Sequence, residues 1–246
     1  VRTAAMPPLS VPDHESHKYT RGLVAVVAGA MSGAAELAAR AALRSGAGYV
    51  QIHGGRIPAT PPFALVRKLW RDGEALTDPR INAIVIGPGL GQGEGAIARF
   101  AAALASAKPL VIDADALALL PPHPLDVPAI LTPHAGEFAR LYQGEGGKIA
   151  ATRALAAQSG AVVLHKGADT VIAAPDGRVA LHTPSSPWLA SAGTGDVLAG
   201  ICGAMLARGL DAFDAAQAAV ILHSQAAKRT RPGLIADDLV ASAIWP

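Results

Sequence analysis

Short apolar runs alternate with longer amphipathic segments along most of this 246-residue chain. The apolar runs predict strands at residues 23–28, 49–53, 81–86, 110–112, 129–131 and 161–165. The segments between them predict helices at residues 33–45, 94–107, 137–142 and 148–159. Because these strands are apolar throughout instead of alternating, the pattern predicts an α/β fold whose mostly parallel sheet is covered on both faces.

The C-terminal third departs from this alternation. Residues 170–174 and 178–183 flank Pro175-Asp176-Gly177, which predicts a hairpin. Helices are expected at residues 194–208, 212–230 and 237–244. Residues 1–20 predict an extended, proline-rich lead-in, and no linker divides the remainder. We therefore expect a single domain over residues 21–246.

Glycines and polar residues follow the predicted strands at their carboxyl ends. These residues are Gly29, the run Gly87–Gly91, Asp113, His134 and Lys166-Gly167. Since open α/β sheets bind their ligands at this edge, the distribution predicts one site.

The turn Gly193-Thr194-Gly195-Asp196 precedes an apolar helical run. A helix that begins at such a turn offers free backbone amides and the positive end of its dipole to an anion. Asp196 then lies beside the anion and could take a proton from a nucleophilic hydroxyl. The simpler alternative is that Thr194 is an ordinary N-cap and Asp196 an ordinary first-turn acid.

Composition and charge exclude several classes of protein. Hydrophobic residues make up 51% of the chain and charged residues 16%, which excludes disorder. The formal charge is +2, and without a basic cluster interleaved with aromatics we expect no nucleic acid partner. No membrane span is expected, because the apolar stretch after Leu23 is broken by charged residues.

The cysteine and histidine content bears on location and metal binding. The single cysteine, Cys202, falls in an apolar helix, where we expect a core residue in a reducing, cytoplasmic location. The eight histidines lack metal-ligand spacing, so no zinc site is expected. No residue is assigned as a metal ligand, and Asp113, at the end of a strand, is expected to help Mg²⁺ or a loop. The first residue is Val, which leaves a preceding domain open.

Four motifs in order carry a family resemblance. They are Gly33-Ala34-Ala35, Gly87-Pro88-Gly89-Leu90-Gly91, the segment Leu131–Glu137 (LTPHAGE) and the segment Gly193–Gly200 (GTGDVLAG). Two further segments fit, Lys166–Thr170 (KGADT) and Ser16–Thr20 (SHKYT). Together they resemble the ADP/ATP-dependent NAD(P)H-hydrate dehydratases of the ribokinase-like superfamily. The resemblance implies a three-layer α/β/α sandwich.

The implied activity is the repair of hydrated NADH and NADPH. Members of this family remove water from the S-epimer, with ADP in most bacterial members and ATP in others. The ring hydroxyl would be phosphorylated by ADP and then eliminated, which would leave AMP and phosphate. The resemblance also implies Mg²⁺, a homo-oligomer, and a fused or separate epimerase domain. The alternatives are a small-molecule kinase of the same superfamily and a nucleotide sensor without catalytic activity.

The resemblance also implies roles for individual residues. Asp196 would be the catalytic base and would contact the hydrated dinucleotide together with Ala34, Gly89 and His134. The nucleotide would be bound by Lys166, Gly167, Ala168, Asp169, Thr170, Gly193, Thr194 and Gly195.

Some positions depart from the family pattern or have a plainer interpretation. The loop before Gly193 lacks the usual Asn and Gly, and Ser185 or Ser186 could replace one hydrogen bond. Ala30 stands where a hydroxyl residue is usual. Glu137 is expected to cap its own helix rather than to act as an acid. Asp115 is expected to be an N-cap for the segment that follows it.

Overall fold

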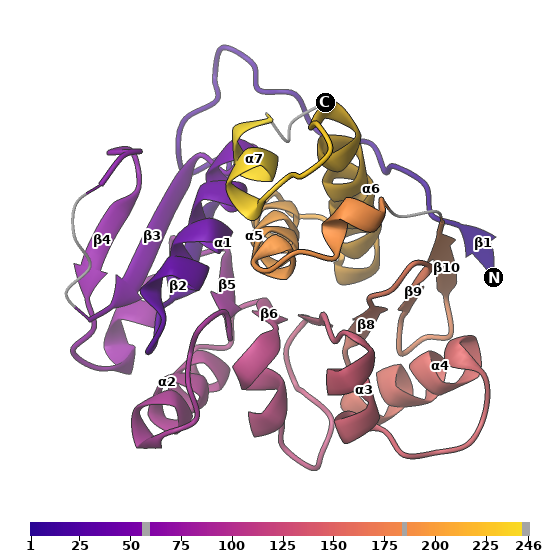
Figure 1. The fold of residues 1–246 in the computed structure, drawn as a ribbon. Coiled ribbons are helices and arrows are strands. Elements are labelled where there is room, and N and C mark those ends of the chain that lie inside the picture. The colour runs from indigo at the N-terminus through magenta and orange to yellow at the C-terminus, as the bar shows by residue number, and fades with distance from the viewer. Residues whose placement is uncertain (56–59, 184–185, 243–246) are drawn as a thin grey trace.

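One ten-stranded sheet forms the centre of the molecule (Figure 1). The computed structural model describes residues 1–55, 60–183 and 186–242. The strands are β1 (Arg2–Thr3), β2 (Leu23–Val27), β3 (Tyr49–Gly54), β4 (Val66–Leu69), β5 (Ala83–Ile86), β6 (Leu110–Ile112), β7 (Ala129–Leu131), β8 (Val162–His165), β9 (Thr170–Ala173) and β10 (Val179–His182). Their order across the sheet is β1-β10-β9-β8-β7-β6-β5-β2-β3-β4.

The sheet is parallel except around the hairpin. Every pair from β4 through β8 is parallel, β8 with β9 and β9 with β10 are antiparallel, and β1 lies parallel to β10. The predicted strands and the predicted hairpin are therefore confirmed. β1 and β4 were not predicted, because one has two residues and the other carries Arg67 and Lys68 at an edge of the sheet. Part of the predicted lead-in is thus a strand.

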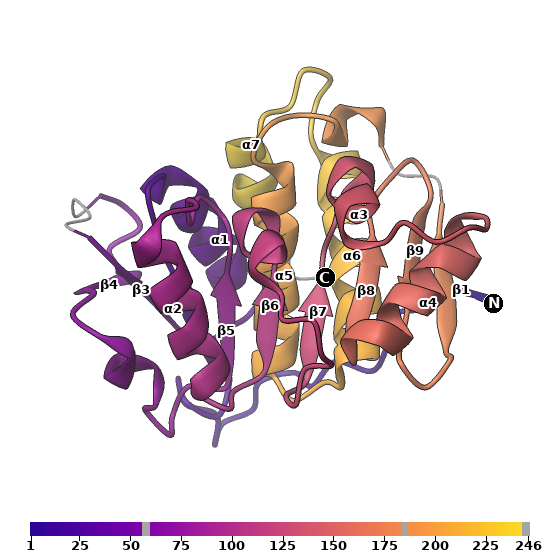
Figure 2. The same cartoon turned by 90° about the horizontal axis from the view of Figure 1, so that it is seen from below.

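Two helical layers cover the sheet, which confirms the three-layer sandwich (Figures 1 and 2). One layer holds α1 (Ser32–Arg44), α5 (Thr194–Ala207), α6 (Ala212–Arg229) and α7 (Ala236–Ala241). The other holds α2 (Glu94–Ala105), α3 (Ala135–Leu141) and α4 (Lys148–Ser159), with the 3₁₀ turns η1 (Gly73–Leu76) and η2 (Ala114–Leu119). A third 3₁₀ turn, η3 (Pro187–Leu189), precedes α5. Each face has its own apolar core.

Helix α5 lies at the centre of its layer and is buried on nearly all sides. Its residues from Val197 to Ala207 are all buried, Cys202 among them as predicted. Two glycines allow its close packing. A Cβ on Gly200 would lie 2.0 Å from the carbonyl oxygen of Ala38 in α1, and one on Gly203 would lie 2.4 Å from Val85 Cγ2 in the sheet. Among the described residues, no helix is long and apolar enough to cross a membrane.

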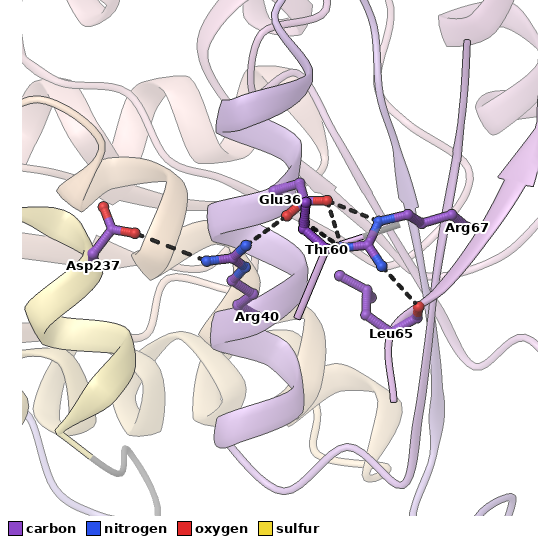
Figure 3. A network of polar contacts seen from close by, with 6 residues as sticks. All are labelled: Glu36, Arg40, Thr60, Leu65, Arg67 and Asp237. Carbon is purple, nitrogen blue, oxygen red and sulfur yellow. Dashed lines mark hydrogen bonds and ion pairs between the residues drawn. The ribbon is translucent and has the colours of Figure 1, made fainter. Parts of the chain in front are cut away.

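A polar network ties α1 to its surroundings (Figure 3). The carboxylate of Glu36 in α1 accepts hydrogen bonds from Arg67 Nη2 in β4 at 2.7 Å and from Arg40 Nη2 at 2.9 Å. Arg40 in turn faces Asp237 of α7 at 3.9 Å. Because the Glu36 side chain is only 13% exposed, the contact with Arg67 fixes α1 against the edge strand.

We predict that Gly200→Ala destabilises the fold by about 2 kcal/mol, since overpacking of a filled core outweighs the gain of about 1 kcal/mol in helix propensity. Chemical denaturation measures the difference in the free energy of unfolding. Gly95→Ala is the matched control, because in α2 the added Cβ would meet only the flexible end of Arg99. Equal effects of the two substitutions would contradict the close packing of α5.

Candidate functional site

The glycine loop after β5 is folded against the start of α1. Gly89 has a φ of 61°, and a Cβ there would lie 2.2 Å from the carbonyl oxygen of Met31. The amide of Met31 donates to the carbonyl of Gly89 at 2.9 Å. The same Cβ would lie 3.1 Å from the Cβ of Ala34, so the two predicted substrate residues are neighbours. Only glycine allows this approach of two backbones.

Asp115 stabilises the glycine loop rather than a helix. Its Oδ2 accepts from the amide of Gly91 at 2.8 Å. The N-cap position of η2 is taken by Asp113, whose side chain makes no capping bond. The expectation that Asp115 is an N-cap was therefore wrong, because the carboxylate reaches across to the neighbouring loop.

His134 and Glu137 form a reciprocal cap at the start of α3. The Nδ1 atom of His134 accepts from the amides of Gly136 at 3.0 Å and Glu137 at 3.3 Å. Glu137 Oε2 accepts from the amide of His134 at 2.8 Å, which confirms its predicted capping role. An accepting Nδ1 places the proton of the neutral ring on Nε2. The side chain is 57% exposed, and its Nε2 faces Glu137 Oε1 at 3.4 Å, so Glu137 orients both sides of the ring.

The turn at the start of α5 is fixed from two sides. Gly193, with a φ of 84°, is the N-cap, and Thr194 lies in the first turn. The hydroxyl of Thr194 donates to the carbonyls of Leu189 and Ser191, at 2.7 and 2.9 Å. His223 Nε2 of α6 lies 2.9 Å from the Thr194 carbonyl oxygen. The alternative that Thr194 is the N-cap is therefore wrong, and both its hydroxyl and its amide, which donates to the Ser191 carbonyl at 3.4 Å, hold the turn.

An ion pair of Lys166 and Asp113 lies beneath this turn, which itself carries Asp196. Lys166, just after β8, donates from Nζ to Asp113 Oδ1 at 3.0 Å. The pKa of Asp196 is raised to about 7, first by burial and next by the negative charge of Asp113, while Lys166 opposes both effects. Burial by itself would lower the pKa of Lys166, but the carboxylates of Asp113, Glu137 and Asp196 outweigh it and raise that pKa.

A cavity of about 720 Å³ opens beside the turn, between β8, α5 and α6. Of the predicted residues, it is lined by His134, Lys166, Gly167, Ala168, Thr170, Thr194 and Gly195. Sequence reasoning missed its apolar wall, formed by Pro187, Leu189, Leu198 and Val220, and the buried side chains of His223 and Ser224. Helical periodicity marks the α6 residues as buried, but nothing in the sequence brings them to the turn at Thr194.

Four other predicted residues are not part of the lining of this cavity. Ala34 lies in α1, Gly89 in the loop after β5, and Gly193 and Asp196 at the start of α5. Asp169 also lies outside the lining, and its carboxylate accepts from Lys148 Nζ at 3.0 Å. Lys148 also bonds the Asp169 carbonyl, so the pair holds the loop after β8 to α4. Ser186 lines the cavity, whereas Ser185 lies outside the described residues.

Comparison with solved structures identifies the class of fold. The ribokinase of Arabidopsis thaliana, in complex with ribose and ATP, aligns with 90% of this chain and 98% of its own at a TM-score of 0.61. At 10% identity, this likeness concerns the fold alone. The three-layer architecture is therefore ribokinase-like, as predicted.

More similar proteins narrow the class to a family. A family model described as NAD(P)H-hydrate dehydratase matches residues 24–239. The ADP-dependent (S)-NAD(P)H-hydrate dehydratase of Neisseria meningitidis is 38% identical over 94% of this chain and 86% of its own. The ADP/ATP-dependent enzyme of Bacillus subtilis, co-crystallised with ATP/Mg²⁺, is 34% identical over 96% of this chain and 92% of its own, with a TM-score of 0.84. The chain belongs to the NAD(P)H-hydrate dehydratase family.

Other relatives are about twice as long. The bifunctional NAD(P)H-hydrate repair enzyme Nnr of Mycobacterium leprae is 41% identical over 88% of this chain but only 47% of its own. The chain thus spans about half the length of such bifunctional relatives.

We predict that acid weakens the fold through its buried histidines. Burial lowers the pKa of His223 to about 4, and the same holds for His53 and His165. Unfolded histidine has a pKa of about 6.5, so between about pH 4 and 6.5 the unfolded chain binds protons that the folded chain does not. Stability is therefore complete above this window and is lost as the pH falls through it.

The free energy of unfolding, measured against pH, checks this expectation. His223→Asn should reduce the slope between pH 4.5 and 6.5 by up to about one proton, or about 1.4 kcal/mol per pH unit. The matched control is His123→Asn at an exposed position. An equal loss of slope in both variants would contradict the assignment.

Proposed function

We propose that the chain dehydrates the S-epimer of hydrated NADH or NADPH at the expense of ADP or ATP, with ADP the expected donor. The observation that carries the proposal is the position of Asp196, half-buried in the first turn of α5 beside the backbone amides that begin this helix. Family membership supports the choice of substrate, because the relatives of N. meningitidis and B. subtilis carry this activity in their names. A small-molecule kinase would use the same turn, but the matching family model favours the dehydratase.

The proposed reaction moves a phosphoryl group and then releases it. Asp196 takes the proton of the ring hydroxyl while the hydroxyl oxygen attacks the terminal phosphorus of ADP. The bond between this phosphorus and the oxygen that leaves with AMP breaks. The amides of residues 193–195 would stabilise the charge that develops on the transferred group. Phosphate then leaves with the electrons of the carbon–oxygen bond, and a ring proton departs as the double bond forms. The products are NAD(P)H, AMP and phosphate.

The cavity offers a place for the adenine nucleotide. Lys166, Gly167, Ala168 and Thr170 would contact it on one side, and the apolar residues of η3, α5 and α6 suit a flat base on the other. The hydrated ring would lie towards Ala34, Gly89 and His134. This arrangement would place the terminal phosphoryl group at the turn before Asp196.

Mg²⁺ would enter with the nucleotide. No three His, Cys, Asp or Glu side chains converge as a metal cage within residues 1–55, 60–183 and 186–242. We therefore propose that the cation is held mainly by phosphate oxygens and water, which are ligands that Mg²⁺ prefers. When bound, it would neutralise charge on the transferred phosphoryl group. The co-crystallisation of the B. subtilis relative with ATP/Mg²⁺ supports the pairing.

We propose a cytoplasmic homo-oligomer, in keeping with the family resemblance. The bifunctional relatives support an epimerase as the companion activity, fused to this domain or separate from it.

We predict that Asp196→Asn lowers kcat by about 10²–10⁴-fold, because the base is lost while the shape of the side chain is kept. The assay follows the return of NADPH absorbance from hydrated NADPH with Mg²⁺ and either ADP or ATP. Wild-type kcat should rise between pH 6 and 8, as Asp196, with its pKa of about 7, becomes a carboxylate.

The control is Asp126→Asn, which removes a carboxylate from an exposed loop. It should leave kcat within about twofold of wild type, since a charge so exposed is largely screened. Wild-type protein that binds nucleotide but returns no NADPH with either donor would contradict the dehydratase assignment. Stable phosphorylated product would instead indicate the kinase.

A further inference from the structure

Asp113 lies beneath the candidate site without lining its cavity. It follows β6, its side chain is 2% exposed, and its Oδ1 accepts from Lys166 Nζ at 3.0 Å. The two residues follow strands separated by β7, so the pair bridges the carboxyl edge of the sheet. A Cβ built on Gly195 would lie 3.3 Å from Lys166 Nζ and 4.0 Å from Asp113 Oδ2. The ion pair therefore lies directly under the first turn of α5.

The charges around Asp196 are unbalanced. Asp113 faces it from the end of β6, Asp115 from η2 and Glu137 from α3, whereas Lys166 is the cation that faces it from the end of β8. Asp115 and Glu137 already accept from backbone amides. Asp113 is the carboxylate bonded to the lysine. It is therefore the residue through which the position of the ammonium can be controlled.

We propose that Asp113 is a positioning residue: its ion pair fixes the Lys166 ammonium beneath the turn at Gly195, and its carboxylate holds a negative charge under the same turn, which carries Asp196. The kinetic consequence rests on the proposed function, but the two physical effects do not. An ammonium held at one point can meet a phosphate without a loss of side-chain freedom at the moment of binding. The negative charge of Asp113 also raises the pKa of Asp196, so that Asp196 exchanges its proton near neutral pH.

The first test is a titration that needs no turnover. ¹³C NMR of aspartate carboxyls would follow wild type, Asp113→Asn and Asp126→Asn, with Asp196→Asn used for assignment. In Asp113→Asn the midpoint of Asp196 should fall by about one pH unit or more, because a neighbouring like charge is removed. Asp126→Asn should leave the midpoint in place. An unchanged or higher midpoint in Asp113→Asn would overturn the proposal.

The second test asks whether Asp113 acts through Lys166. Calorimetry with ADP and Mg²⁺ should show about tenfold weaker binding for Asp113→Asn and at least as large a loss for Lys166→Met. In the double variant, the loss should equal that of Lys166→Met alone, since residues that share one contact are not additive. Additive losses would overturn the positioning role. Asp113→Glu, which keeps the charge, should recover part of the affinity.

Circular dichroism and thermal unfolding establish whether each variant folds, since breaking a buried ion pair can cost about 3–5 kcal/mol. If Asp113→Asn does not fold, Lys166→Met takes its place. With the cation gone and Asp113 still charged, the Asp196 midpoint should rise, and a fall would overturn the proposal.

Kinetics then separates this proposal from the proposed function. In an active enzyme, Asp113→Asn should shift the acidic limb of the kcat profile to lower pH by the same amount as the titration midpoint, because Asp196 acts as a base. A wild-type chain without dehydratase activity would contradict the proposed function alone. A shifted midpoint with an unmoved kinetic limb would contradict the role of Asp113 in the reaction.

Discussion

The close contact between α5 and its neighbours is the constraint on which the rest of the structure depends. Gly200 lies against the backbone of α1, and Gly203 lies against Val85 of the sheet, so the helix axis can move towards neither. Because the helix is fixed in this way, its first turn lies at the carboxyl edge of the sheet. The loops after β5, β6, β7 and β8 begin at the same edge. The packing of α5 thus determines where the site lies.

The local pattern of the chain predicted those parts of the fold that depend on burial. A strand buried on both faces must be apolar throughout, which is why β2, β5 and β8 are recognisable. The edge strand β4 has no such requirement and carries Arg67, which serves the network around Glu36. Asp115 shows the same limit at the site. Its type and place suited an N-cap, but the bond to Gly91 depends on how two loops meet.

Some residues of the candidate site could likewise be predicted from the sequence, and others could not. Glycines and charged residues at strand ends identified Lys166, His134 and the turn before Asp196, because few other roles need those residue types there. The wall from α6 could not be found, since His223 and Ser224 look like ordinary buried helix residues. The bond between His223 and the Thr194 carbonyl joins residues 29 positions apart. Such a contact follows from the packing of α5 on α6, which the pattern of either helix alone does not specify.

The proposed polyphosphate site is rich in carboxylates, which needs a physical reason. The amides at the start of α5 and the Lys166 ammonium would attract the anion, while Asp113 and Asp196 would repel it. The repulsion is limited because Asp113 is neutralised by Lys166 and Asp196, with its pKa of about 7, is partly protonated near neutral pH. A permanently charged base would oppose the nucleotide, and a permanently protonated one could not accept a proton. In the proposed function, the burial that raises the pKa of Asp196 would therefore serve binding and catalysis together.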